Sequence, residues 1–385
     1  MKRTGVERMA KKLEQTKSSF KLIGKVSRID KDGAYEEAEQ TKDGKHKGDT
    51  YRKLKFGVKT SKTNEITVEM YDYEPERVFL WNSEKKKEDK EYKGDWIPFG
   101  TWEEQEEDLK AQGYAVLQSR IGLEKDDKGK IISRGVPSYV ASEEIYNNVD
   151  NNDSVVVEGE IRYSEFENQQ GELMKRKSFT IKKLYKLTKD VDFDAEDFEE
   201  ITYYEQEMVY VDIDIDKKEG KAFVIGRIID FAGNFVDSQF IIPLKDEEGN
   251  EDEKMTRLAK TIKDKISFGD VIKVYGDTLN RAVIKQVEKE DDKDDLFAQF
   301  GGKKKPKHAE SYTARDYISE MQIHGLEEWT EAVYEEEDFV KEELIENSGK
   351  KSLSDEFGGK SKKKGKNPFE TDEDDDEGYD GELPF

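Results

Sequence analysis

The chain has 385 residues, of which 41% are charged and 34% hydrophobic, and its formal net charge is −24. This length allows two ordinary domains, but the composition indicates that part of the chain is unfolded or built of small, thin-cored units. No cysteine is present, which excludes disulfides, thiol catalysis and cysteine-ligated zinc.

Apolar runs are too short for a membrane protein. None approaches the roughly 18 residues that a spanning helix needs, and the sequence from Met1 to Thr4 leads into no hydrophobic signal segment. We therefore expect a soluble, cytoplasmic protein without a membrane partner.

The negative charge is distributed unevenly. Residues 1–190 hold 38 basic and 37 acidic side chains, residues 191–290 hold 14 and 25, and residues 291–385 hold 14 and 28. Only the first half is therefore electrostatically permissive for a polyanion.

After an N-terminal arm, residues 1–17, the first half shows the two-residue period of β-strands. Leu22, Gly24 and Val26 share one face of the first segment, and the next two segments alternate in the same way. The predicted strands of this unit, residues 18–190, are 20–29, 51–60, 65–72, 78–81, 154–163 and 177–187.

A helix is predicted immediately before the last two of these strands. Ser142 can cap it, and Glu143 and Glu144 suit its first turn, so we expect a helix over 142–149. Three strands, a helical region and a final hairpin is the order of an OB-fold barrel. Residues 83–137 are then an insertion, with a helix predicted at 103–112 and a hairpin turn at 126–129.

The second unit, residues 201–290, repeats this plan more compactly. Strands are predicted at 208–215, 222–229 and 235–242, a helix at 253–266, and closing segments at 268–276 and 282–287. The predicted fold class is therefore mainly β with some helix, as two tandem OB-fold-like barrels followed by a short helical segment and a disordered acidic tail.

Composition changes beyond the second unit. A charged linker, residues 291–312, precedes residues 313–347, which we interpret as two helices that break at Gly325 and either dock on the second unit or bind another protein. Residues 348–385 form the predicted disordered tail.

The sequence contains no recognisable catalytic or metal-binding constellation. His46, His308 and His324 are the only histidines and stand without a second ligand at metal-binding spacing. Phosphate-loop and nucleophile-elbow motifs are also absent. We expect a protein that is not an enzyme and has no cofactor or metal.

Binding a single nucleic-acid strand requires aromatic faces for the bases and cations for the phosphates, displayed on one groove. The outward positions of the predicted strands supply both kinds of side chain, although some of the rings can equally fill the core and the basic stripe can be a solvated face. The residues that we expect to bind nucleic acid are Lys21, Lys25, Tyr51, Lys53, Lys55, Lys59, Tyr71, Tyr73, Trp81, Trp96, Arg162, Lys175, Arg176 and Lys177.

The last sixteen residues, 370–385, contain nine carboxylates and no Lys or Arg. Such a run is typical of a solvated tail, yet it closes on an apolar residue, a rigid proline and an aromatic ring, which suits a short peptide captured in another protein's pocket. The residues expected to bind a partner are Asp380, Glu382, Leu383, Pro384 and Phe385.

This ending resembles the C-terminal tip of bacterial and bacteriophage single-stranded DNA-binding proteins, although Gly381 and Glu382 stand in place of a continuous Asp run. The resemblance implies OB-fold domains that hold DNA upstream of a tip that recruits replication, recombination or repair proteins, such as a polymerase, helicase, primase or nuclease. For a phage-encoded chain the location implied is the host cytoplasm.

We therefore expect a protein that coats single-stranded DNA without sequence specificity, as a monomer or a homo-oligomer. One alternative is an acidic scaffold or DNA mimic that binds a host enzyme and no nucleic acid. Another is an RNA-binding protein, because stacking surfaces do not by themselves select the sugar. A tail kept only for solubility is a third interpretation.

Overall fold

The computed structural model describes residues 12–41, 44–168, 171, 173–246, 248–288 and 311–339. Its first strands are β1 (Ser18–Ser27), β2 (Tyr35–Glu39), β3 (Thr50–Lys59), β4 (Glu65–Tyr73), β5 (Arg77–Asn82), β6 (Asp95–Pro98), β7 (Tyr114–Val116), β8 (Ser119–Lys125) and β9 (Ile131–Val136). The remaining strands are β10 (Ser154–Glu167), β11 (Leu173–Lys186), β12 (Ile201–Asp216), β13 (Lys221–Ile229), β14 (Phe235–Pro243), β15 (Val271–Glu288) and β16 (Ser311–Thr330).

The helices are α1 (Ser83–Glu88), α2 (Phe99–Ala111), α3 (Ser138–Asn148) and α4 (Glu253–Lys265), with a short 3-10 helix at Glu336–Phe339. The prediction of a mainly β protein with some helix is confirmed. No helix in the described ranges is long and apolar enough to cross a membrane.

Thirteen strands hydrogen-bond into one large mixed sheet, and within it five strands of the first half pair in a circuit. β1 pairs with β3 and β10, β10 pairs with β11, β11 pairs in parallel with β4, and β4 pairs with β3. Alternate residues point inward, so that Leu22, Phe56, Val68, Val157 and Ile181 are buried together. We call these five strands the first circuit.

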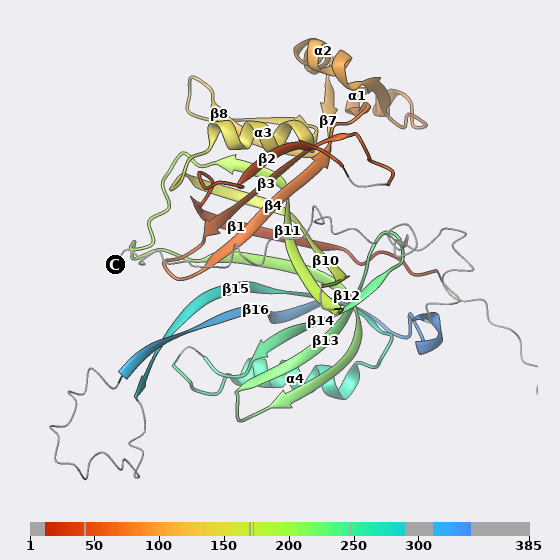
Figure 1. Cartoon of the computed structure of the whole chain (residues 1–385). Helices are drawn as coiled ribbons and strands as arrows, with labels where there is room; N and C mark the ends of the chain where they lie inside the picture. The colour runs from red at the N-terminus through yellow and green to blue at the C-terminus, as the bar shows by residue number, and fades with distance from the viewer. Residues whose placement is uncertain are drawn as a thin grey trace, which may run out of the picture.

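Five strands of the second half repeat this pattern. β12 pairs with β13 and β15, β13 pairs with β14, β14 pairs in parallel with β16, and β16 pairs with β15. These strands are the second circuit. Each circuit has a helix between its third and fourth strands: α3 packs on β3 and β4, and α4 packs on β12 and β14. Figure 1 shows the two groups, one with α3 and the other with α4.

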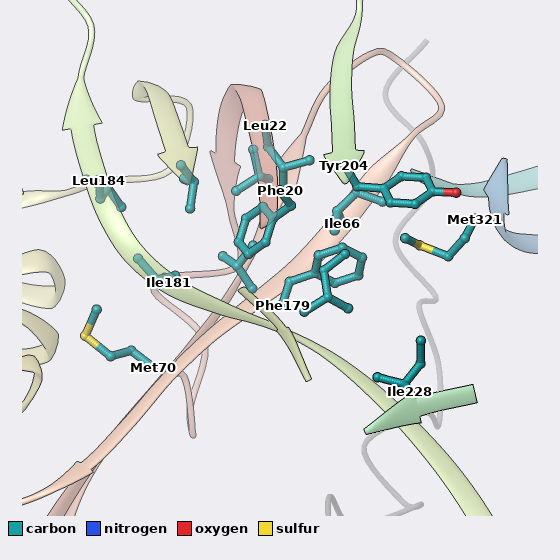
Figure 2. Close-up of a cluster of buried hydrophobic side chains, with 14 of the residues drawn as sticks. Phe20, Leu22, Ile66, Met70, Phe179, Ile181, Leu184, Tyr204, Ile228 and Met321 are labelled. Carbon is teal, nitrogen blue, oxygen red and sulfur yellow. The ribbon is translucent and has the colours of Figure 1, made fainter. Parts of the chain in front are cut away.

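The two circuits are joined by strand β1. Six of its residues pair with β12, from Ser18 opposite Gln206 to Ile23 opposite Ile201. One hydrophobic cluster continues across this joint: Figure 2 shows Phe20 and Phe179 of the first circuit gathered near Tyr204, with Met321 of the second circuit beyond it. The two circuits therefore share a core instead of lying on a flexible connection.

A polar joint stands beside this shared core, at the turn between β3 and β4. Asn64 is 1% exposed and pairs as an isolated bridge with Arg281 of β15. The carboxylate of Glu200 accepts hydrogen bonds from the side chains of Thr60 (2.7 Å), Asn64 (2.8 Å) and Arg281 (2.7 Å). These bonds fix the turn of the first circuit on the second.

The insertion forms its own structure at one end of the first circuit. Strands β5, β6 and β7 make a three-stranded sheet, and α1 and α2 lie with it (Figure 1). The predicted helix at 103–112 is the second part of α2, and the predicted turn at 126–129 joins β8 to β9. The β8–β9 hairpin pairs with β11 of the first circuit.

The two predicted helices after residue 313 are wrong, because Ser311–Thr330 is the strand β16. Its residues Met321 and Ile323 are buried and alternate with less buried neighbours, which is the two-residue period of a strand. The predicted closing strand 282–287 is the C-terminal part of β15. The strand that pairs with both β14 and β15 is β16, which lies beyond residue 290, the predicted end of the second unit. Apart from residues 311 and 312, the predicted linker lies outside the described residues, as does the predicted tail.

We expect Gly24→Ala to destabilise the protein by roughly 1–3 kcal/mol or more, as overpacking does. Gly24 lies where β1 crosses β3, and a Cβ there would stand 2.0 Å from the carbonyl oxygen of Lys59. Urea unfolding followed by circular dichroism measures the change. Gly100→Ala in α2 is the control, because open space surrounds Gly100. Equal stability of the two variants would contradict a close crossing of β1 and β3.

Candidate nucleic-acid interface

Outward-facing side chains of β3 and β4 form a continuous surface, which we call the β3–β4 face. Leu54, Phe56 and Val58 occupy the inward positions of β3, so the residues between them must point away from the core. Across the ladder, Tyr51 lies opposite Tyr73, Lys53 opposite Tyr71, and Lys55 opposite Glu69. The register thus places tyrosines at one end of the face and lysines beside them.

The tyrosines pack closely on one another. The ring centroid of Tyr71 lies 5.3 Å from that of Tyr51 and 5.4 Å from that of Tyr73. Tyr51 is only 8% exposed and donates its hydroxyl to Glu36 (2.8 Å). It is therefore a buried ring on which Tyr71 and Tyr73 pack. Tyr71 and Tyr73 are partly exposed.

A histidine extends this aromatic surface. The His46 ring stacks on Tyr73 at 4.1 Å between centroids and 10° between planes, and its Nδ1 lies 2.9 Å from the carboxylate of Asp49. Sequence reasoning missed His46 as a site residue, because nothing in the pattern of a loop residue shows that it lies against a strand 27 positions later in the chain.

Burial raises the pKa of two of these hydroxyls, those of Tyr51 and Tyr71. It raises the pKa of Tyr51 to about 12, with the hydrogen bond to Glu36 adding to the effect. Burial and a hydrogen bond to Tyr73 also raise the pKa of Tyr71 well above its usual range. The rings therefore carry no negative charge at neutral pH that would repel a phosphate.

Four cations gather at the other end of the face: Arg28, Lys53, Lys55 and Arg176. Two of them are ion-paired, Arg28 with Glu65 and Arg176 with Glu69, each at 2.7 Å. Within the described residues, Lys53 and Lys55 make no ion pair. Burial lowers the pKa of Lys55, and the neighbouring cations lower it further against the opposing effect of Glu69. This end of the face therefore has a local excess of positive charge that an anion would relieve.

Of three other predicted lysines, Lys21 and Lys25 lie on β1, and Lys59 lies at the end of the β3–β4 face farthest from its tyrosines. Lys21 stands 3.8 Å from Glu158 on the side of β1 that meets β10. Lys25 and Lys59 face each other where β1 crosses β3, with the ammonium of Lys25 5.6 Å from the Phe193 ring.

The predicted tryptophans belong to the three-stranded sheet of the insertion. Trp96 is 63% exposed and lies 5.2 Å from Phe79, while Trp81 packs on Tyr92 at 5.5 Å. They form a separate aromatic surface and not the wall of one groove with Tyr71. The predicted partner-binding residues of the tail, 380–385, lie outside the described residues.

The β10–β11 hairpin carries the last group of predicted residues. Arg162 is exposed on β10, whereas Lys175, Arg176 and Lys177 line a cavity of about 390 Å³ against the second circuit. Burial lowers the pKa of Lys177 to about 8. Among the described residues, the Phe179 ring, 5.7 Å from the ammonium, is the group that contacts its charge.

We expect Lys177→Met to be more stable than the wild-type chain at pH 7, because it removes a poorly compensated buried cation. The pKa of Lys177 is lower in the folded chain than its ordinary value of 10.5, so the unfolded state binds more protons between about pH 8 and 10.5. As pH rises through this window, the free energy of unfolding of the wild-type chain should therefore increase relative to that of the variant. Urea titrations at a series of pH values measure the difference, and a variant that is less stable at pH 7 would contradict the burial of this charge.

Comparison with known proteins places the chain in a family. No curated protein matches it. Among solved structures, a deletion mutant of the single-stranded DNA binding protein from Thermus aquaticus aligns with 10% identity and a TM-score of 0.32, over 82% of this chain and 95% of that chain. An identity and a TM-score this low support no inference about fold or ligand. A family model described as YorF matches residues 87–356, more than half of the sequence. The chain therefore belongs to the YorF family.

Proposed function

We propose that this protein binds single-stranded DNA on the β3–β4 face without sequence preference. The observation that carries the proposal is the pair of lysines, Lys53 and Lys55, which make no ion pair with any described residue and lie beside the partly exposed rings of Tyr71 and Tyr73. A single strand offers unstacked bases for the rings and a phosphate on each nucleotide for the lysines. A duplex offers the phosphates but keeps its bases stacked.

We further propose that each circuit is an OB-type barrel. The support is the order of pairing, which is the same in both circuits: strands one, two, three, five and four in a ring, with strands three and five parallel and a helix between strands three and four. In OB-folds the second and third strands form the face that binds oligonucleotides. In the first circuit these strands are β3 and β4.

The second circuit lacks a comparable basic surface among its described residues. Its outward tyrosines, Tyr203 and Tyr275, lie 6.4 Å apart, and Tyr203 donates its hydroxyl to Glu205. Lys273 beside them is held by both Glu205 (2.9 Å) and Glu327 (2.7 Å). We propose that DNA binds the first circuit and that the second serves for support or protein contacts.

The role proposed is binding and not catalysis, in DNA replication, recombination or repair. The acidic C-terminal tip, outside the described residues, is proposed to recruit the partner proteins of those processes. The alternative of an acidic scaffold or DNA mimic follows from the net charge of −24 and predicts no affinity for any nucleic acid.

We expect Lys53→Ala/Lys55→Ala to weaken binding of fluorescent oligo-dT and to reduce its dependence on salt. Two lost phosphate contacts correspond to a decrease of about 1.4 in the slope of log K against log salt, at roughly 0.7 per contact on a single strand. Lys217→Ala/Lys218→Ala, which removes two exposed charges from the second circuit, is the matched control. An unchanged affinity and slope in the first variant would rule out the β3–β4 face.

The aromatic contribution is tested separately. Tyr71→Ala should lose roughly 1–3 kcal/mol of binding free energy, the value of one stacked base. Tyr203→Ala, which removes a ring from the second circuit, should bind as the wild type does. Parallel titrations with oligo-U and duplex DNA measure sugar and strand selectivity. Equal affinity for the duplex would contradict base stacking, and no binding in any titration would favour the acidic scaffold.

A further inference from the structure

The cavity of about 390 Å³ lies where the two circuits meet beyond their shared core. Its walls are the β10–β11 hairpin on one side and strands β13, β14 and β16 on the other. The volume falls within the range of about 300–1,000 Å³ that small-molecule pockets occupy. One wall residue, Arg176, also ion-pairs with Glu69 beside Lys55, so the cavity is connected to the basic end of the β3–β4 face.

The three consecutive cations of the hairpin differ in how their charge is compensated. Lys175 donates to the backbone carbonyl of Asp237 (2.5 Å) and stands 3.8 Å from the carboxylate of Glu165. Arg176 is paired with Glu69 at 2.7 Å. Lys177 makes no ion pair or hydrogen bond within the described residues, and the Phe179 ring compensates its charge only weakly.

No acidic side chain of the cavity wall is available to Lys177. The acid that lines the cavity is Asp237, and both its carboxylate oxygens accept from Arg227, at 2.7 and 2.9 Å. Tyr163 also lines the cavity, and its buried hydroxyl has no hydrogen-bond partner within the described residues. Within the described residues, an unpaired ammonium and an unpaired hydroxyl therefore line one cavity. Both can donate, so an anion with several acceptor oxygens would complement the two together.

We infer that this cavity is a phosphate-binding site, in which the ammonium of Lys177 provides the charge and the hydroxyl of Tyr163 a second donor. A phosphate group fits because it combines negative charge with several acceptor oxygens, whereas a chloride ion offers charge alone. The phosphate comes either from a free nucleotide or from a strand that continues from the β3–β4 face past Arg176. Only the second source rests on the proposed function.

The test is thermal unfolding of the full chain in inorganic phosphate and in sodium chloride at equal ionic strength. A ligand of the folded state raises the unfolding temperature with its concentration. We expect phosphate to raise it more than chloride does, and we expect Lys177→Met to weaken the apparent phosphate affinity by about tenfold or more, as loss of a charged hydrogen bond does. Tyr163→Phe should weaken it less and leave the charge unchanged.

Lys183→Met is the matched control, because Lys183 is on the same strand but pairs with Glu158 outside the cavity. It should keep the full phosphate effect. Equal shifts in phosphate and chloride for the wild type would overturn the inference, and so would an undiminished phosphate effect in Lys177→Met. Since no DNA is present, failure here leaves the proposed function of the β3–β4 face untouched.

Two further titrations identify the source of the phosphate. If thymidine monophosphate binds the wild type more tightly than inorganic phosphate and Lys177→Met abolishes the difference, the site takes a free nucleotide. If saturating oligo-dT removes the phosphate effect, and Lys53→Ala/Lys55→Ala restores it, a phosphate of the bound strand occupies the cavity. Both results support the inference and differ only in the ligand.

Discussion

Strand β1 is the constraint on which the rest of the structure depends, because it pairs with β3, β10 and β12. One of its edges pairs with β10, and its other edge pairs with β12 over residues 18–23 and with β3 over residues 25–27. The close crossing at Gly24 and the continuous cluster from Phe20 to Met321 follow from this double role. The β10–β11 hairpin consequently lies against the second circuit in a fixed position, and a cavity forms between them.

This arrangement separates the basic and acidic side chains of the two circuits. Ion pairs compensate two of the four cations near the β3–β4 face, Arg28 and Arg176, and within the described residues they leave Lys53 and Lys55 unpaired beside an aromatic surface. The second circuit holds its central Lys273 between two glutamates. A chain with a net charge of −24 can therefore present a small basic and aromatic surface on one half, while the other half carries most of the negative charge.

Periodicity predicted most strands and helices α2, α3 and α4. Each of these elements buries one face, and the spacing of its apolar residues shows that face within its own sequence. It failed at β16, where Met321 and Ile323 alternate within a sequence whose other apolar residues also fit a helix. The lysines and tyrosines of β3 and β4 were predictable from outward parity. The burial of Tyr51, the stacking of His46 and the cavity around Lys177 were not, because each depends on segments far apart in the sequence.

Photocrosslinking tests the central claim most directly. The full chain is crosslinked to an oligo-dT that carries bromodeoxyuridine, and the modified peptides are identified by mass spectrometry. The account predicts adducts on the peptides that contain Tyr71 and Tyr73, since these rings are the ones that stack on bases. Adducts confined to strands β12 to β16, under conditions in which the strand is bound, would contradict it.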